Sequence, residues 1–209
     1  MARLVLASAS PRRSELLQRL GVRFDVRPAE IEEDPGSSTD PQIVARRLAR
    51  AKAETARLHD EYAPILAADT VVALAGRLLG KPADADEARD MLLALRWREH
   101  EVVTAVAWMP LGKRSAIIRH PLTRVTMRRY TDDEIEASIA RGDPLDKAGA
   151  YAIQDELLRP VERYDGCYCN VVGLSLWATI DVMRKAGEKI DAGSVDFLPQ
   201  CAACPLARS

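Results

Sequence analysis

Short runs of apolar residues alternate with amphipathic segments along most of the chain. The runs have the length and composition of buried strands and lie at residues 4–7, 22–26, 64–74, 101–107 and 117–127. Between them, apolar positions at helical spacing and capping residues predict helices that begin near residues 11, 41, 83, 131 and 177. This alternation of strands and helices predicts an α/β fold built on a central sheet.

The run at 64–74 is the strongest predicted strand in the chain. Its nearly continuous apolar character is typical of a strand that is buried on both faces in the middle of a sheet. Asp69 interrupts this run. A buried carboxylate is costly unless it is hydrogen-bonded, paired with a cation or bound to a metal. The pattern therefore makes Asp69 a candidate functional residue.

A predicted turn joins the first strand to the first helix, with the sequence Ala-Ser-Ala-Ser-Pro-Arg-Arg at residues 7–13. Ser10 suits the N-cap and Pro11 the first helical position. Arg12 and Arg13 then fall in the first turn, where the helix dipole disfavours each cation by about 0.3–1 kcal/mol. An anion bound between the arginines, the serines and the free backbone N–H groups would offset this cost. The alternative is an exposed arginine pair in an arginine-rich chain.

The composition limits the kinds of partner that the chain can bind. Its 209 residues suit one large domain or two small lobes, and 47% hydrophobic residues are ordinary for a globular protein. The net charge of −1 argues against a general nucleic-acid or membrane-surface role, so any attraction for phosphate must be local. No apolar run approaches the length of a membrane span, and we expect a cytoplasmic protein. Only six of the 30 basic residues are lysines, so a lysine inside a motif stands out.

Two further features have an ordinary interpretation beside a functional one. Residues 30–34 carry four acids in five positions, which is typical of a solvated loop. The alternative is that one of them, Glu33, turns inward to hold a divalent cation. An isolated histidine is more often structural than catalytic, and we interpret His100 as structural.

Five separated motifs resemble those of the Maf-like nucleoside triphosphate pyrophosphatases, in the order of that family. They are Ser8-x-Ser10-Pro11-Arg12-Arg13, Ala68-Asp69-Thr70, Gly80-Lys81-Pro82, Lys147-Ala-Gly-Ala-Tyr-x-Ile-Gln154 and Asp165–Leu174. The motif at 147–154 is the most specific of them. The resemblance implies a twisted mixed sheet flanked by helices, with two lobes and an active-site cleft between them, as in inosine triphosphate pyrophosphatases. It also divides the chain into a Maf-like domain at 1–190 and a cysteine-containing C-terminal tail at 191–209.

The resemblance implies hydrolysis of dTTP and UTP to the monophosphate and pyrophosphate, with Mg²⁺ or Mn²⁺ as cofactor. It implies catalytic roles for Asp69, Lys81 and Glu33. Glu33 and Asp69 would hold the metal or act as the base, and the sequence leaves open which does which. The resemblance assigns substrate binding to Ser8, Arg12, Arg13, Lys52, Thr70, Lys147 and Gln154. The expected partner is a nucleoside triphosphate, with no nucleic acid and no membrane, and the sequence leaves open whether the chain forms a homodimer.

Other functions stay open at this point. One is a pyrophosphatase for 7-methyl-GTP or another modified purine nucleotide, and another is a non-enzymatic nucleotide-binding regulator of septum formation. Asp69 favours an enzyme, because a simple binder has little use for a buried carboxylate beside a polyphosphate. The carboxamide of Gln154 suits thymine or uracil. Two departures from the family pattern lie beside it, since Ala152 replaces a usual glycine and Asp155 replaces a glycine-rich turn.

Four cysteines form two close pairs, Cys167-x-Cys169 and Cys201-x-x-Cys204. Cys-x-x-Cys is half of a typical zinc site, and four thiols would complete one. In a cytoplasmic protein a metal is favoured over a stable disulfide. Free thiols are the default interpretation, and the sequence does not decide between them and zinc.

Overall fold

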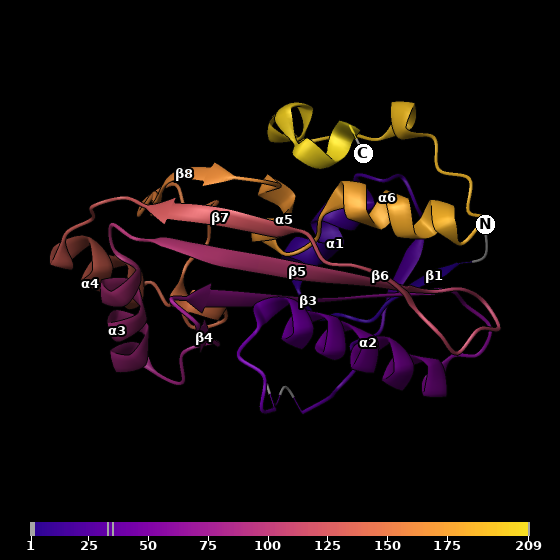
Figure 1. Ribbon diagram of the computed structural model, residues 1–209, viewed down its shortest axis with the longest axis horizontal. Coiled ribbons are helices and arrows are strands. Elements are labelled where there is room, and N and C mark those ends of the chain that lie inside the picture. Colours follow the sequence, from indigo (N-terminus) through magenta and orange to yellow (C-terminus); the bar gives the residue numbers. More distant parts are fainter. Residues whose placement is uncertain (1–2, 33, 35, 209) are drawn as a thin grey trace.

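The computed structural model describes residues 3–32, 34 and 36–208. Over these residues, an eight-stranded mixed sheet runs through the molecule with helices on both faces (Figure 1). The strands are β1 (Leu4–Leu6), β2 (Phe24–Val26), β3 (Ile65–Leu74), β4 (Arg77–Leu79), β5 (Glu99–Met109), β6 (Ile117–Arg119), β7 (Leu122–Met127) and β8 (Val161–Asp165). The α/β fold with a helix-flanked mixed sheet is therefore confirmed.

The strand order is β2-β1-β3-β5-β7-β8, with β4 paired to β3 and β6 paired to β5. β1 runs parallel to both of its neighbours, and the other pairings are antiparallel. The helices are α1 (Pro11–Gln18), α2 (Pro41–His59), α3 (Ala85–Leu95), α4 (Asp132–Ala140), α5 (Tyr168–Val172) and α6 (Leu176–Lys185). In Figure 1, α2 covers one face of the sheet, and α1, α5 and α6 cover the other.

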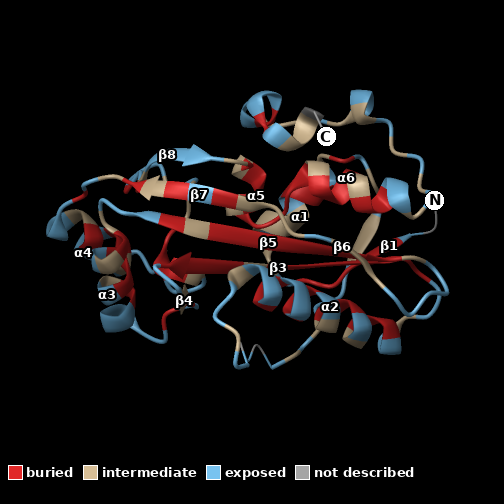
Figure 2. Cartoon of the chain, in the orientation of Figure 1, coloured by how far each residue is buried: buried red, intermediate tan, exposed pale blue. Residues whose placement is uncertain are grey.

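The long antiparallel pair of β3 and β5 forms the buried centre of the sheet (Figure 2). Side chains of a strand alternate between the two faces. Ile65 and Ala67 accordingly pack in the cluster under α2, whereas Leu66 and Ala68 pack in the cluster under α1 and α6. A third cluster joins the far end of this strand pair to α3, α4 and β7. The same alternation directs Asp69 toward α2 and Thr70 toward α1.

Several predicted local signals are confirmed. Asp40 caps α2 and Thr131 forms a full capping box with Glu134 at the start of α4. A hairpin turn joins β3 to β4, and Ala75 and Gly76 both adopt positive φ angles there, 50° and 80°. Such angles are required at both central residues of the turn that matches the twist of two antiparallel strands.

The sequence pattern predicts an apolar face of α2 formed by Ile43, Val44, Leu48, Ala51 and Thr55, and the structure agrees only in part. Val44 and Leu48 are buried, but Ile43 is 52% exposed. Small residues complete the buried face, among them Ala45, Ala49 and Ala53. Alanines let a helix approach a sheet closely, and a weighting by side-chain size misses them. Lys52 lies on this buried face.

The C-terminal residues 191–208 pack against the core and are not a detached tail. They form short 3₁₀ turns, η2 (Ala192–Ser194), η3 (Pro199–Ala203) and η4 (Pro205–Arg208). The Phe197 ring stacks on Trp177 of α6 with centroids 4.4 Å apart. Arg19, just after α1, forms a 2.7 Å ion pair with Asp196. Within the described ranges, no helix combines the length and the apolar character needed to span a membrane.

His100 lies in β5 with 2% of its surface exposed, and its Nε2 hydrogen-bonds the Tyr151 hydroxyl at 2.7 Å. Burial lowers the pKa of His100 from its ordinary value of 6.5 to about 4. The ring is therefore neutral at pH 7. These contacts agree with a structural interpretation of this histidine.

The lowered pKa of His100 predicts acid sensitivity of the fold. As pH falls from 6.5 toward 4, the unfolded chain protonates this ring before the folded chain does, so the free energy of unfolding decreases. The lowered pKa corresponds to about 3 kcal/mol in the free energy of unfolding. This stability is fully present above pH 6.5 and is lost as pH falls from 6.5 to 4. Urea unfolding at several pH values measures it, and His100→Gln is expected to flatten the pH dependence. Equal slopes for the two proteins would contradict this expectation.

Candidate active site

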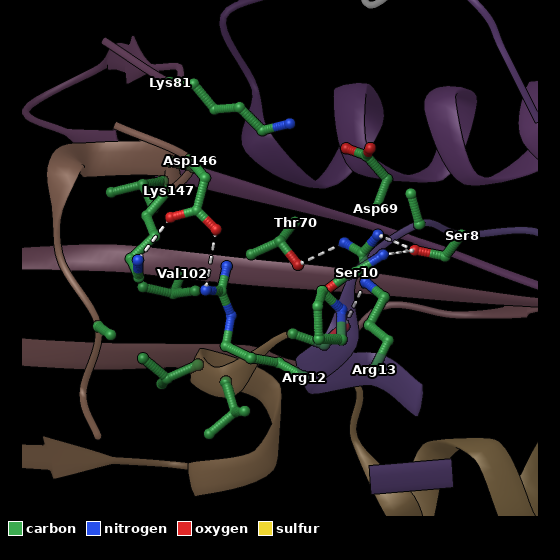
Figure 3. Close-up of a pocket in the computed structure, with 18 of the residues that line it drawn as sticks. Ser8, Ser10, Arg12, Arg13, Asp69, Thr70, Lys81, Val102, Asp146 and Lys147 are labelled. Atoms are coloured by element: carbon green, nitrogen blue, oxygen red, sulfur yellow. Dashed lines mark hydrogen bonds and ion pairs between the residues drawn. The ribbon is translucent and has the colours of Figure 1, made fainter. Parts of the chain in front are cut away.

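A cleft of about 490 Å³ opens between the loop after β1, the middle of β3 and residues 146–154 (Figure 3). Its lining contains the following residues that the sequence singled out: Ser8, Arg12, Arg13, Lys52, Asp69, Thr70, Lys81, Lys147 and Gln154. Glu33 lies outside the described residues. Segments that are distant in sequence therefore meet at one cavity.

The loop between β1 and α1 forms one wall of the cleft. Ser8 is buried, and its Oγ accepts hydrogen bonds from the Ser10 N–H at 3.3 Å and from Arg13 Nη1 at 3.1 Å. Ser10 occupies the predicted N-cap position of α1, but its hydroxyl makes no capping hydrogen bond. The loop is instead closed on itself by Ser8, which keeps the first turn of α1 directed at the cleft.

Arg13 connects three walls of the cleft. Its Nε donates to the Gly173 carbonyl at 2.9 Å, and its Nη2 donates to Thr70 Oγ1 at 3.1 Å. Together with the bond to Ser8, these contacts use both terminal nitrogens and the Nε of the guanidinium group. Arg13 therefore positions its neighbours as well as lining the cavity.

Arg12 points to the other side of the cleft and shares a carboxylate with Lys147. Arg12 Nη1 lies 3.3 Å from Asp146 Oδ2, and Lys147 Nζ pairs with Asp146 Oδ1 (Figure 3). Burial opposes ionisation of Asp146, but the hydrogen bond from Lys147 and the charges of both cations outweigh it and lower the pKa of this carboxyl. Sequence reasoning gave Asp146 no role, although it stands beside the motif lysine. Asp146 thus holds Arg12 and Lys147 together at the rim of the cleft.

Asp69 and Lys52 form a buried ion pair at the floor of the cleft. Lys52 Nζ donates to Asp69 Oδ1 at 2.6 Å, and the two side chains are 10% and 7% exposed. The pair compensates the cost of burying either charge. The sequence analysis assigned Lys52 to substrate binding through the family resemblance alone. The alanine-lined face of α2 explains why it is buried.

Lys81 reaches the cavity from the loop after β4, opposite α1 (Figure 3). Its side chain is exposed, and among the described residues no hydrogen bond or ion pair to its ammonium group is present. The loop is held in place because the Gly149 N–H donates to the Gly80 carbonyl at 3.0 Å. Gly149 has a φ of 70°, and an added Cβ would lie 3.1 Å from Val72 Cγ1. This close approach explains the glycine in the motif at 147–154.

A buried polar chain fixes Thr70 from behind the cleft. Thr104 Oγ1 donates to the Asn170 carbonyl at 2.6 Å, so the 2.9 Å contact between the two threonines makes Thr70 the donor. The Asn170 side chain accepts from the Thr104 N–H at 2.8 Å and donates to the Val102 carbonyl at 2.9 Å. Sequence reasoning matched Asn170 to a motif without giving it a role. A polar residue buried against apolar strands is the signal that could have found it.

Gln154 lies at the mouth of the cleft, where a smaller adjoining cavity of about 280 Å³ begins. Arg12 and Lys147 line both cavities. The neighbouring Asp155, which departs from the family pattern, is occupied in the turn: its Oδ1 accepts from the N–H groups of Leu157 and Leu158 at 2.9 Å each. Asp155 therefore shapes the loop beside Gln154, which is exposed.

The donor set in the cleft suits a hard divalent cation. Asp69 and Glu30 both line the cavity, and the sequence analysis had not singled out Glu30 from the acidic loop. Mg²⁺ is usually held by one or two carboxylates together with oxygens of a bound phosphate. Across residues 3–32, 34 and 36–208, no three His, Cys, Asp or Glu side chains are arranged to hold a metal by themselves.

The fold and the cleft define an α/β protein with a cation-lined pocket around a buried carboxylate. The model of the Maf-like protein family matches residues 3–186, and the chain belongs to that family. The family expected from the motifs is thus confirmed.

Relatives of this chain share most of its length. A protein of Thermomicrobium roseum named dTTP/UTP pyrophosphatase is 53% identical over 206 residues, which cover 98% of this chain and 94% of that protein. Proteins of the same name from Myxococcus xanthus and Citrifermentans bemidjiense are 46% and 44% identical, each over 88% of this chain and over 92% and 95% of their own lengths.

Proposed function

We propose that the protein is a nucleoside triphosphate pyrophosphatase that hydrolyses dTTP and UTP to the monophosphate and pyrophosphate. The observation that carries this proposal is the Asp69–Lys52 pair, a buried carboxylate at the floor of a cleft with cations on its rim. The names of the relatives supply the substrate class. A regulator that only binds nucleotide would need the cations but not the buried carboxylate.

Cationic side chains on different sides of the cleft bind the triphosphate. Lys81 lies on one side of the cleft near Asp69, and Arg12 and Lys147 meet at Asp146. A polyphosphate carries more charge than one carboxylate and competes with Asp146 for both cations. Arg13 keeps its three internal bonds and orients Ser8 and Thr70 toward the ligand.

Asp69 is assigned to the attacking water. The water oxygen forms a bond to the α-phosphorus, the bond from that phosphorus to the bridging oxygen breaks, and pyrophosphate leaves. Asp69 accepts the proton of the water, while Lys52 orients the carboxylate through the 2.6 Å hydrogen bond. Positive charges around the leaving pyrophosphate stabilise the charge that develops there.

A divalent cation, Mg²⁺ or Mn²⁺, is part of this proposal. With Asp69 assigned to the attacking water, Glu33 is the residue assigned to hold the cation, with phosphate oxygens as further ligands. When bound, the cation neutralises phosphate charge and polarises the α-phosphoryl group.

Gln154 is assigned to base recognition. Thymine and uracil present carbonyl acceptors around one N–H donor, and a carboxamide can satisfy both kinds of group. Cytosine places an amino donor where these bases have a carbonyl, and 7-methylguanine is larger and cationic. When a bound base buries the carboxamide, a polar group left unpaired against the wrong base costs about 1–3 kcal/mol, or roughly 5- to 150-fold in kcat/KM.

Competing-substrate kinetics test the base preference. We expect kcat/KM for dTTP and UTP to exceed that for CTP, ATP and 7-methyl-GTP by this factor. Gln154→Ala is expected to narrow the preference, while Gln18→Ala, a glutamine variant at the far end of α1, should leave it unchanged. A higher kcat/KM for 7-methyl-GTP than for dTTP would instead favour the modified-purine function.

A further inference from the structure

The four cysteines come together in one buried cluster outside the cleft. Cys167 caps α5 and Cys169 lies within it, while Cys201 lies in η3 and Cys204 ends that turn. All four are buried with free thiols, at 3%, 0%, 2% and 3% exposure. Two segments that are more than 30 residues apart in sequence thus bring two thiols each to the same place.

One pair of thiols is in contact across the two segments. Cys169 Sγ and Cys201 Sγ are 3.3 Å apart, and Cys167 and Cys204 lie in the same buried cluster. A disulfide requires a sulfur separation of about 2.05 Å. In a tetrahedral zinc–thiolate site, Zn–S bonds of about 2.3 Å place neighbouring sulfurs about 3.8 Å apart. The observed contact is closer to the second geometry than to the first.

Hydrogen bonds fix the two turns that carry the cysteines. The Asn170 N–H donates to the Cys167 carbonyl at 3.1 Å, and the Ala207 N–H donates to the Cys204 carbonyl at 2.9 Å. The Cys167 thiol donates to Ser175 Oγ at 3.4 Å. The short turns therefore present two thiols each to the same buried cluster.

We propose that Cys167, Cys169, Cys201 and Cys204 bind one structural zinc ion. Zinc is the thiophilic cation that takes four thiolates in a closed tetrahedral site and has no redox chemistry of its own. Each thiol that binds as a thiolate releases its proton. In the present positions of the side chains, no three potential metal ligands among the described residues lie close enough together to hold one ion. The two sulfur pairs must therefore approach each other when the ion binds.

The zinc would fasten the C-terminal segment to the helix that supports the cleft. Residues 191–208 contain only short 3₁₀ turns, which supply few hydrogen bonds of their own. Cys169 immediately precedes Asn170, which anchors Thr104, and α5 ends at Gly173, whose carbonyl holds Arg13. A zinc ion bound to α5 would thus stabilise the contacts of Asn170 with Thr104 and of Gly173 with Arg13, although the ion itself lies outside the cleft. This inference does not depend on the substrate proposed above.

Metal analysis of the untagged full chain tests the site. The protein is purified under reducing conditions, washed with EDTA to remove weakly held cations, and analysed by mass spectrometry for metals. We expect about one zinc ion per chain, and less than about a tenth of an equivalent would overturn the proposal. Iron or copper in its place, or disulfides between these cysteines, would overturn it as well.

Two variants locate the ion. Cys201→Ser/Cys204→Ser should lose the zinc and show faster hydrogen exchange over residues 195–206, whereas Asp69→Asn should retain it. Zinc that persists in the double-cysteine variant, or disappears with Asp69→Asn, would place the ion elsewhere and contradict the proposal. Cobalt(II) substitution of the wild-type protein should give sulfur-to-metal charge-transfer bands, and their absence would contradict thiolate ligation.

Discussion

Asp69→Asn is expected to lower kcat for dTTP by about 10²–10⁴-fold while nucleotide binding remains measurable. The carboxylate is the proposed proton acceptor, and an amide cannot take the proton. The cations at the rim of the cleft are unchanged, so the polyphosphate still has its partners. Steady-state kinetics and calorimetric titration with a non-hydrolysable dTTP analogue separate the two effects. Full activity of the variant would contradict the assignment.

The control for Asp69→Asn must account for Lys52. The asparagine oxygen can still accept the hydrogen bond from Lys52, so the loss of stability should be smaller than the about 3–5 kcal/mol typical of a broken buried ion pair. Asp132→Asn removes an exposed pair with Arg96 far from the cleft and should leave kcat unchanged. The Lys52→Met/Asp69→Asn double variant should recover stability and remain inactive.

Lys81→Ala is expected to lower kcat/KM by about 10- to 150-fold, with KM rising and kcat falling. A hydrogen bond to a charged group contributes about 1.5–3 kcal/mol, and Lys81 is assigned to the triphosphate both before and during bond breaking. Its exposed side chain makes the free energy of unfolding insensitive to the change. Initial-rate measurements over a range of dTTP concentrations give both constants.

Lys113→Ala is the matched control, because Lys113 is also an exposed lysine but lies in the turn between β5 and β6. It should leave both kcat and KM unchanged. If Lys81→Ala has no greater effect than this control, Lys81 has no role in binding the triphosphate.

The sequence predicted those parts of the fold that depend on local pattern. The apolar run around Asp69 predicted β3, and the Thr131 capping box predicted the start of α4. In each case the signal lies within a few residues of the feature. The buried face of α2 was harder to predict, because its alanines carry little hydrophobic weight although they permit close packing.

Partners across the fold could not be predicted from local pattern. Asp69 lies 17 residues from Lys52, and Arg12 lies 134 residues from Asp146. These contacts depend on the strand order β1-β3-β5, which no periodicity encodes. Family motifs indicated which residues share a cleft, but not that Asp146 occupies the space between two cations. The C-terminal segment was expected as a tail because 3₁₀ turns leave no periodic signal.

The central claim is that the cleft directs water to the α-phosphorus of a pyrimidine nucleoside triphosphate. Phosphorus NMR of the products from dTTP tests it most directly. The account predicts dTMP and pyrophosphate in equal amounts, with neither dTDP nor orthophosphate formed early in the reaction. Release of dTDP with orthophosphate, or no hydrolysis of dTTP in the presence of Mg²⁺ or Mn²⁺, would contradict it.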